Sequence, residues 1–86
     1  MLRIAPRIEG NLAILVLSGR IEDVSLSNLD ALIKAQTRPL ILDLKEVTLA
    51  GQAGVRFLAQ CEETGVGIRN CPAYIREWIS RERGTG

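Results

Sequence analysis

Apolar residues alternate with polar ones from Leu2 to Ile8, a spacing that predicts a half-exposed strand. Pro6 favours the edge of a sheet for this strand, because no hydrogen-bond donor is then missing from the ladder. After the turn signal at 9–11, residues 12–17 are apolar at every position, which predicts a strand covered on both faces. We expect the two strands to form an antiparallel hairpin with the second strand inside the sheet.

The spacing changes to a helical one after Gly19. A helix is predicted from about Glu22 to Gln36, with one apolar stripe that contains Leu26, Leu29, Leu32 and Ile33. It ends before Pro39, since the residue before a proline avoids the helical region. The short apolar run Leu40 to Leu44 then predicts an interior strand, followed by a tight bend.

A second helix is predicted from about Gln52 to Thr64. Successive residues of a helix are rotated by 100°, which assigns each residue to a face. The inward face carries Gly54, Phe57, Leu58 and Cys61, and the exposed face carries Gln52, Arg56 and Glu63. A short strand at 66–68 follows, and Pro72 opens a third helix with Ile75, Trp78 and Ile79 inside. We expect residues 82–86 to form a frayed tail.

The element order β-β-α-β-α-β-α predicts one α/β domain over residues 1–86, with a mixed four-stranded sheet and helices packed on it. The net charge of +1 argues against nucleic acid as a partner, since binding phosphates needs concentrated positive charge. No apolar run approaches the roughly 20 residues of a membrane span, so no membrane insertion is expected. The start of the chain does not resemble a signal peptide, and a cytoplasmic location is the default expectation.

The sequence offers little material for catalysis. It contains no histidine, which removes the commonest general base and metal ligand together. Cys61 falls on an inward helix face as a small apolar filler, and for Cys71 we favour packing over thiolate chemistry. Asp43 lacks a catalytic partner and is interpreted as bonding the turn that follows it. We therefore predict no enzymatic activity, cofactor or metal.

The segment Gly51–Gly54 has two interpretations. Its free N–H groups could cradle a phosphate at a helix start, but its glycines match neither the Rossmann nor the Walker spacing. We favour a structural interpretation, in which Gly51 permits a turn and Gly54 lets the helix approach the sheet closely. From the residues alone, the face with Gln52 and Arg56 is better explained as a solvated helix face than as a binding surface.

From Leu2 to Ser80 the chain resembles the STAS domain, the fold shared by bacterial anti-sigma-factor antagonists and the tails of sulphate transporters. The strongest match is the run from Asp43 to Leu58: an apolar strand with Asp-Leu, a hydrophobic pair, and a small-Gly-aliphatic sequence that opens a helix. Gly19 after the second strand also matches, as does the third-helix start with Pro72, Arg76 and Glu77.

The resemblance implies a non-catalytic regulatory module that docks a protein through the helix start at Gly51–Val55. Regulated members carry Asp-Ser there, and a partner kinase phosphorylates the serine. Gly51 and Gln52 occupy these two positions, and Gln52 has no hydroxyl group, so we expect no phosphoacceptor and no phosphoswitch. The partner-binding residues expected on this basis are Gly51, Gln52, Ala53, Gly54, Arg56 and Glu63.

The implied partner is an anti-sigma factor or kinase with an ATP-binding fold. The alternative is a permanent accessory subunit of an ABC lipid transporter, bound to the ATPase subunit. The chain is short against the family, lacking the last strand and helix of many members, which leaves a homo-oligomer open. Regulation elsewhere also stays open, with candidate phosphorylation sites at Ser18, Ser25, Ser27 and Thr48.

Overall fold

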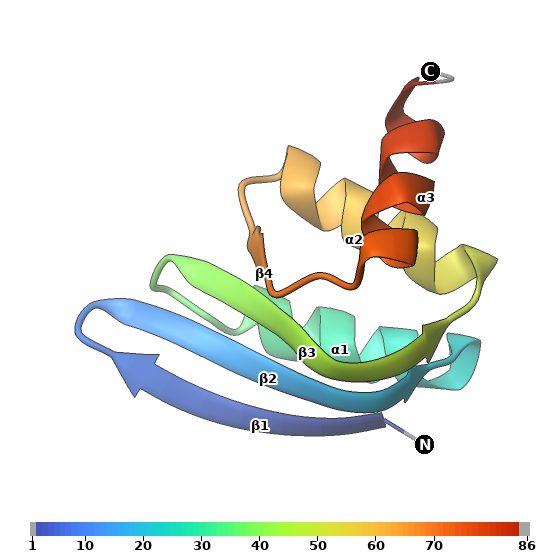
Figure 1. The fold of residues 1–86 in the computed structure, drawn as a ribbon. Coiled ribbons are helices and arrows are strands. Elements are labelled where there is room, and N and C mark those ends of the chain that lie inside the picture. The colour runs from blue at the N-terminus through green and yellow to red at the C-terminus, as the bar shows by residue number, and fades with distance from the viewer. Residues whose placement is uncertain (1, 85–86) are drawn as a thin grey trace.

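The computed structural model describes residues 2–84, and its elements follow the predicted order (Figure 1). They are β1 (Leu2–Glu9), β2 (Leu12–Ile21), α1 (Asp23–Lys34), β3 (Leu40–Ala50), α2 (Gln52–Glu63), β4 (Gly67–Arg69) and α3 (Ala73–Gly84). The predicted fold class, α/β with a mixed four-stranded sheet, is confirmed. Within residues 2–84, no helix is long and apolar enough to cross a membrane.

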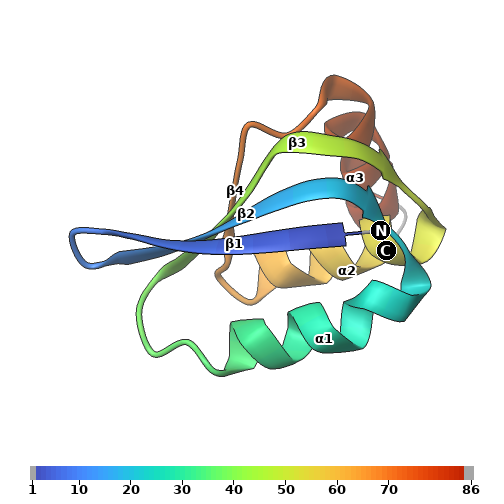
Figure 2. The same ribbon diagram turned by 90° about the horizontal axis from the view of Figure 1, so that it is seen from below.

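The four strands form one sheet in the order β1-β2-β3-β4. β1 pairs antiparallel with β2, whereas β2–β3 and β3–β4 are parallel, which confirms the hairpin with its second strand inside. α1 and α2 lie on the same face of this sheet (Figure 2). α3 packs against α2, and the Tyr74 hydroxyl donates a hydrogen bond to the Thr48 carbonyl of β3 at 3.0 Å.

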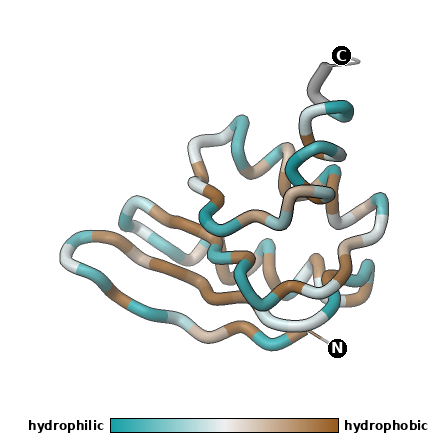
Figure 3. The backbone as a smooth tube through the Cα atoms, in the orientation of Figure 1, coloured by the Kyte–Doolittle hydropathy of each residue, from teal (hydrophilic) through white to brown (hydrophobic). Residues whose placement is uncertain are grey.

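The core lies between the sheet and the helices. Hydrophobic residues follow one another along β2 and β3 (Figure 3), as the apolar runs predict. Side chains with no exposed surface come from five of the elements: Leu17, Leu29, Leu42, Leu44, Val55, Leu58, Ile75 and Ile79. Each such side chain stabilises the fold by about 1.5–3 kcal/mol relative to an exposed one.

β3 is longer than the sequence predicts. It continues past Leu44 to Ala50, where a bend was expected. At each of two register shifts, β3 contains one residue more than the paired segment of β2, and the two strands stay paired beyond both shifts. Such bulges bend a strand and break its two-residue alternation. The buried positions after Asp43 are accordingly Leu44, Val47 and Ala50, every third residue, which does not look like a strand in the sequence.

Two further boundaries differ from expectation. β2 does not end at Ser18 but runs to Ile21, because Gly19 adopts a φ of 95° that keeps the strand continuous through an irregularity. α3 continues to Gly84, so residues 82–84 of the expected tail are helical, and the Glu82 carboxylate lies 3.6 Å from Arg56 Nε on α2. Residues 85–86 of that tail lie outside the described residues.

Candidate functional site

The candidate site lies where β2 and β3 end. Ile21 and Ala50, the last residues of these parallel strands, are register partners. The chain then enters α1 at Asp23 and α2 at Gln52, so two helix N-termini lie at one edge of the sheet. In open α/β sheets, sites form outside the carboxyl ends of the strands. We call Gly51–Val55, the segment that opens α2 here, the α2 tip.

The α2 tip is exposed only in its first part. Gly51 and Gln52 are exposed, Ala53 is half-buried, and Gly54 and Val55 are buried. A Cβ atom on Gly54 would lie 2.9 Å from Ile21 Cγ2 and 3.3 Å from the Ile21 carbonyl oxygen. Gly54 therefore supports close packing of α2 on β2, as the structural interpretation states. It is buried, and its expected contact with a partner stays a prediction.

Gly51 does not need the conformational freedom of glycine. Its φ of −79° and ψ of −179° are extended values open to any residue, and the space around its Cβ position is empty. As N-cap it provides no side-chain hydrogen bond, and the first turn of α2 carries no acidic residue. The first N–H groups of a helix have no intrahelical acceptor and carry partial positive charge. The α2 tip therefore presents hydrogen-bond donors at the surface.

A hollow of about 400 Å³ separates the α2 tip from the start of α1. Its walls include two exposed apolar side chains, Val24 (86% exposed) and Leu49 (51%). Single exposed apolar residues are ordinary, but two in one hollow beside exposed helix donors suit contact with another protein. The lining residues are Arg20, Ile21, Glu22, Asp23, Val24, Leu49 and Gly51.

Sequence reasoning missed both apolar residues. Leu49 was missed because its segment was interpreted as a bend, whereas it lies on the bulged end of β3. Val24 carries a signal that could have been used: it is an apolar residue of α1 outside the stripe of Leu26, Leu29 and Leu32. By itself such a residue is ordinary, and only its place beside Leu49 in one hollow makes it a candidate contact.

The exposed flank of α2 is only partly as predicted. Gln52 and Arg56 are both exposed and lie one turn apart, and Arg56 pairs with Glu82 of α3. Glu63 is also exposed, but it lies at the other end of α2, about 16 Å along the axis from Gln52 at 1.5 Å per residue. The structure thus brings Gln52 and Arg56 together and leaves Glu63 apart from the α2 tip.

Asp43 lies in the bulged part of β3, away from the α2 tip. Asp43 is 9% exposed, and its Oδ1 accepts hydrogen bonds from the Lys45 N–H at 3.0 Å and from Asn70 Nδ2 at 3.2 Å. The predicted bond to the following backbone is confirmed, although that backbone is a bulged strand and not a turn. Over residues 2–84, no three His, Cys, Asp or Glu side chains are grouped as metal ligands.

The two thiols occupy packing positions. Cys61 is 7% exposed, and burial, with Asp30 as a smaller cause, raises the pKa of its thiol to about 11. Cys71 is half-buried, and burial raises its pKa as well, although Arg76 acts in the opposite direction. A raised pKa disfavours the reactive thiolate, in agreement with the packing interpretation of both residues.

At pH 8, iodoacetamide is expected to modify Cys71 before Cys61, because Cys61 is the more buried thiol. Peptide mass spectrometry over time measures the labelling rates of the two thiols. Faster labelling of Cys61 than of Cys71 in the folded protein would contradict the burial of Cys61.

The raised pKa of Cys61 also affects stability. Since the pKa of folded Cys61 exceeds its ordinary value of 9.0, its contribution to the free energy of unfolding is present below pH 9 and is lost as the pH rises toward about 11.

Solved structures with a similar fold include anti-sigma-factor antagonists. An anti-sigma factor antagonist from Mycobacterium paratuberculosis has a TM-score of 0.67 and 26% identity, over 79% of this chain and 66% of its own length. An antisigma-factor antagonist STAS domain from Rhodobacter sphaeroides has a TM-score of 0.59 over 79% of this chain and 83% of its own; its 13% identity shows the fold alone.

A third similar structure belongs to a much longer protein, Mglu. It has a TM-score of 0.59 and 27% identity over 80% of this chain, but over only 19% of its own length. No family model matches the sequence, and no curated protein matches it. The chain has a STAS-like fold, and it spans just under two thirds of the Mycobacterium antagonist.

Proposed function

We propose that this chain is a non-catalytic regulatory module that docks a protein partner through the α2 tip. The observation that carries the proposal is the exposed, uncapped start of α2 beside the apolar side chains Val24 and Leu49. The similarity to the anti-sigma factor antagonist from Mycobacterium paratuberculosis favours a partner of the anti-sigma-factor type. The contact residues in this proposal are Gly51, Gln52, Ala53 and Arg56, joined by Val24 and Leu49.

Binding at this surface is constitutive in our proposal. The side chain at the position of the family serine is that of Gln52, which donates and accepts hydrogen bonds but cannot take a phosphate. Phosphorylation would add up to two negative charges at a helix N-terminus, and that control is missing here. The partner is therefore held or released by its own state or concentration.

The surface is tested by affinity purification from cells of the source organism, with mass spectrometry of the captured proteins. We expect Gln52→Trp and Arg56→Glu to reduce capture of the main partner at least tenfold, since a bulky side chain or reversed charge then lies in the interface. Both residues are exposed, so thermal unfolding should change little.

The matched control is Arg38→Glu. Arg38 is an exposed arginine in the loop before β3, at the opposite end of that strand from the α2 tip. This variant should capture the partner as the unchanged protein does. Equal capture by all variants would remove the proposed surface. Capture of an ABC transporter ATPase as main partner would keep the surface but replace the anti-sigma-factor assignment by that of a permanent accessory subunit.

A further inference from the structure

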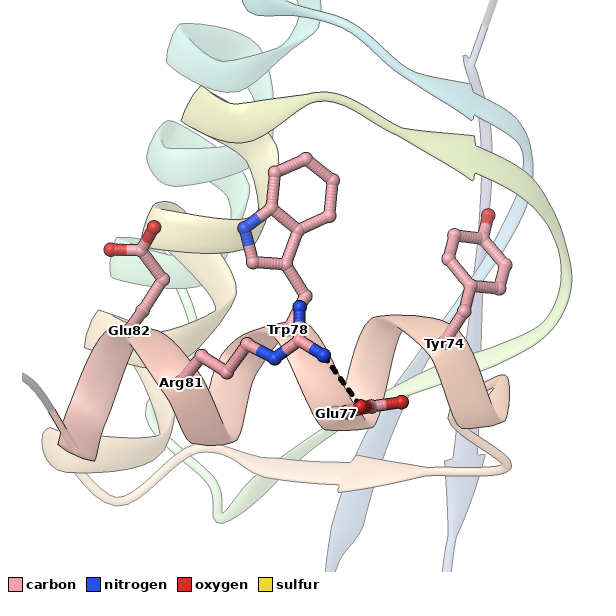
Figure 4. Close-up of a pocket in the computed structure, with 5 residues that line it drawn as sticks. All are labelled: Tyr74, Glu77, Trp78, Arg81 and Glu82. Carbon is pink, nitrogen blue, oxygen red and sulfur yellow. Dashed lines mark hydrogen bonds and ion pairs between the residues drawn. The ribbon is translucent and has the colours of Figure 1, made fainter.

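α3 has a second face that the fold buries only in part. Its inner stripe, with Ile75 and Ile79, has no exposed surface. The residues of the other stripe lie 0, 3, 4, 7 and 8 positions after Tyr74, which places them on one side of the helix. They line a shallow hollow of about 390 Å³ (Figure 4). Its residues are Tyr74, Glu77, Trp78, Arg81 and Glu82. We call this set the α3 stripe.

The α3 stripe holds two of the three aromatic residues of the chain. Tyr74 is 46% exposed. Trp78 is half-buried: its ring is directed toward the start of α2 and packs against the core, and the residue still lines the hollow (Figure 4). Tyrosine, tryptophan and arginine are the residues most enriched among those that dominate binding energy at interfaces. The composition is that of a small contact surface with a ring at its centre and charges around it.

The charges of the α3 stripe complement those of a second copy. Glu77 Oε1 and Arg81 Nη2 lie 2.7 Å apart, with 66% and 74% of their side chains exposed, so the pair is a weak surface one that exchanges partners easily. The two residues stand equally far on either side of position 79. If two α3 helices pair antiparallel about a twofold axis at that position, each Glu77 meets an Arg81 of the other copy.

We propose that two copies of this chain associate through antiparallel α3 helices, with one Glu77–Arg81 pair between the copies on each side of the twofold axis. A twofold interface uses the same patch on both copies and therefore requires self-complementarity, which the Glu77–Arg81 spacing supplies. One face of a twelve-residue helix is smaller than a standard stable interface, so the dimer is weak and depends on concentration. This proposal does not rest on the docking function.

Sedimentation velocity from low micromolar to millimolar concentration tests the association. The unchanged protein should shift from monomer toward dimer. In Glu77→Arg or Arg81→Glu alone, like charges face each other at both pairs, and we expect the dissociation constant to rise at least about tenfold. An equal mixture of these two variants should associate again, because two arginines in one variant then face two glutamates in the other.

Circular dichroism shows whether both variants keep the fold, and Lys34→Glu provides the matched control. Lys34 forms a comparable exposed pair with Asp30 on α1, at 3.0 Å, and its reversal should leave the dimer unchanged. The proposal is overturned if the unchanged protein stays monomeric at millimolar concentration. It is also overturned if the mixture associates no better than either variant alone, or if Lys34→Glu weakens the dimer as much as Glu77→Arg does.

Discussion

Replacing Gly54 by valine is expected to lower the free energy of unfolding by about 2–3 kcal/mol, the cost of overpacking a tight contact. A side chain at this position meets Ile21 Cγ2 at 2.9 Å and the Ile21 carbonyl oxygen at 3.3 Å. Ile21 is 1% exposed and cannot move away, because it lies in the core at the end of β2. In a domain of this size the loss corresponds to a fall of about 10–20 °C in the melting temperature.

The matched control for this prediction is Gly51→Ala, three residues earlier in the chain. The Cβ position of Gly51 has no atom within 4 Å, and its backbone is extended, so the free energy of unfolding should change by less than about 0.5 kcal/mol. Thermal and urea unfolding of both variants measure the difference. If Gly54→Val unfolds like Gly51→Ala, the close approach of α2 to β2 does not constrain the α2 tip.

Asp43→Ala is expected to lower the free energy of unfolding by about 2–3 kcal/mol, since it removes the acceptor of two hydrogen bonds from a largely buried place. One bond, from the Lys45 N–H, supports the bulge of β3, and the other, from Asn70, connects β3 to the segment after β4. Urea unfolding measures the loss. A change below about 0.5 kcal/mol would show that water replaces both bonds at no cost.

Asn70→Gly separates the two bonds of Asp43. Asn70 has a φ of 56°, a conformation that glycine adopts without strain, so this variant removes one hydrogen bond and leaves the backbone unchanged. We expect a loss of about 1 kcal/mol, smaller than for Asp43→Ala. Because both residues belong to one network, the double variant should lose less than the sum of the two single losses.

The order and type of the elements could be predicted from the spacing of apolar residues. β1 and α2 lie within one residue of the predicted ranges. The burial of α2 follows the 3.6-residue period, whereas in β1 only Leu2 and Ile4 follow the two-residue period and Ile8 is exposed. The end of β3 could not be predicted in the same way. Its two bulges are set by pairing with β2, and they change the buried positions to every third residue.

The candidate site, too, could be predicted from the sequence only in part. The exposure of Gln52 and Arg56 follows from their place on a helix whose other face carries Leu58, and it was predicted. Gly54 was expected both to pack and to contact a partner; the distance to Ile21 confirms the packing, and the partner contact stays a prediction. Leu49 became a site residue because the bulged strand leaves it exposed in one hollow with Val24 of α1, which no local spacing indicates.

By itself, the sequence determined the seven elements, the interior position of β2 and the absence of a hydroxyl group at Gln52, since each depends on residue type or on neighbours within one turn. Only the tertiary structure decided the length of β3, the hollow between Val24 and Leu49, and the α3 stripe beside α2. These features depend on the register between strands and on the packing of one helix on another. Both are long-range contacts, which the periodicity of a single segment does not encode.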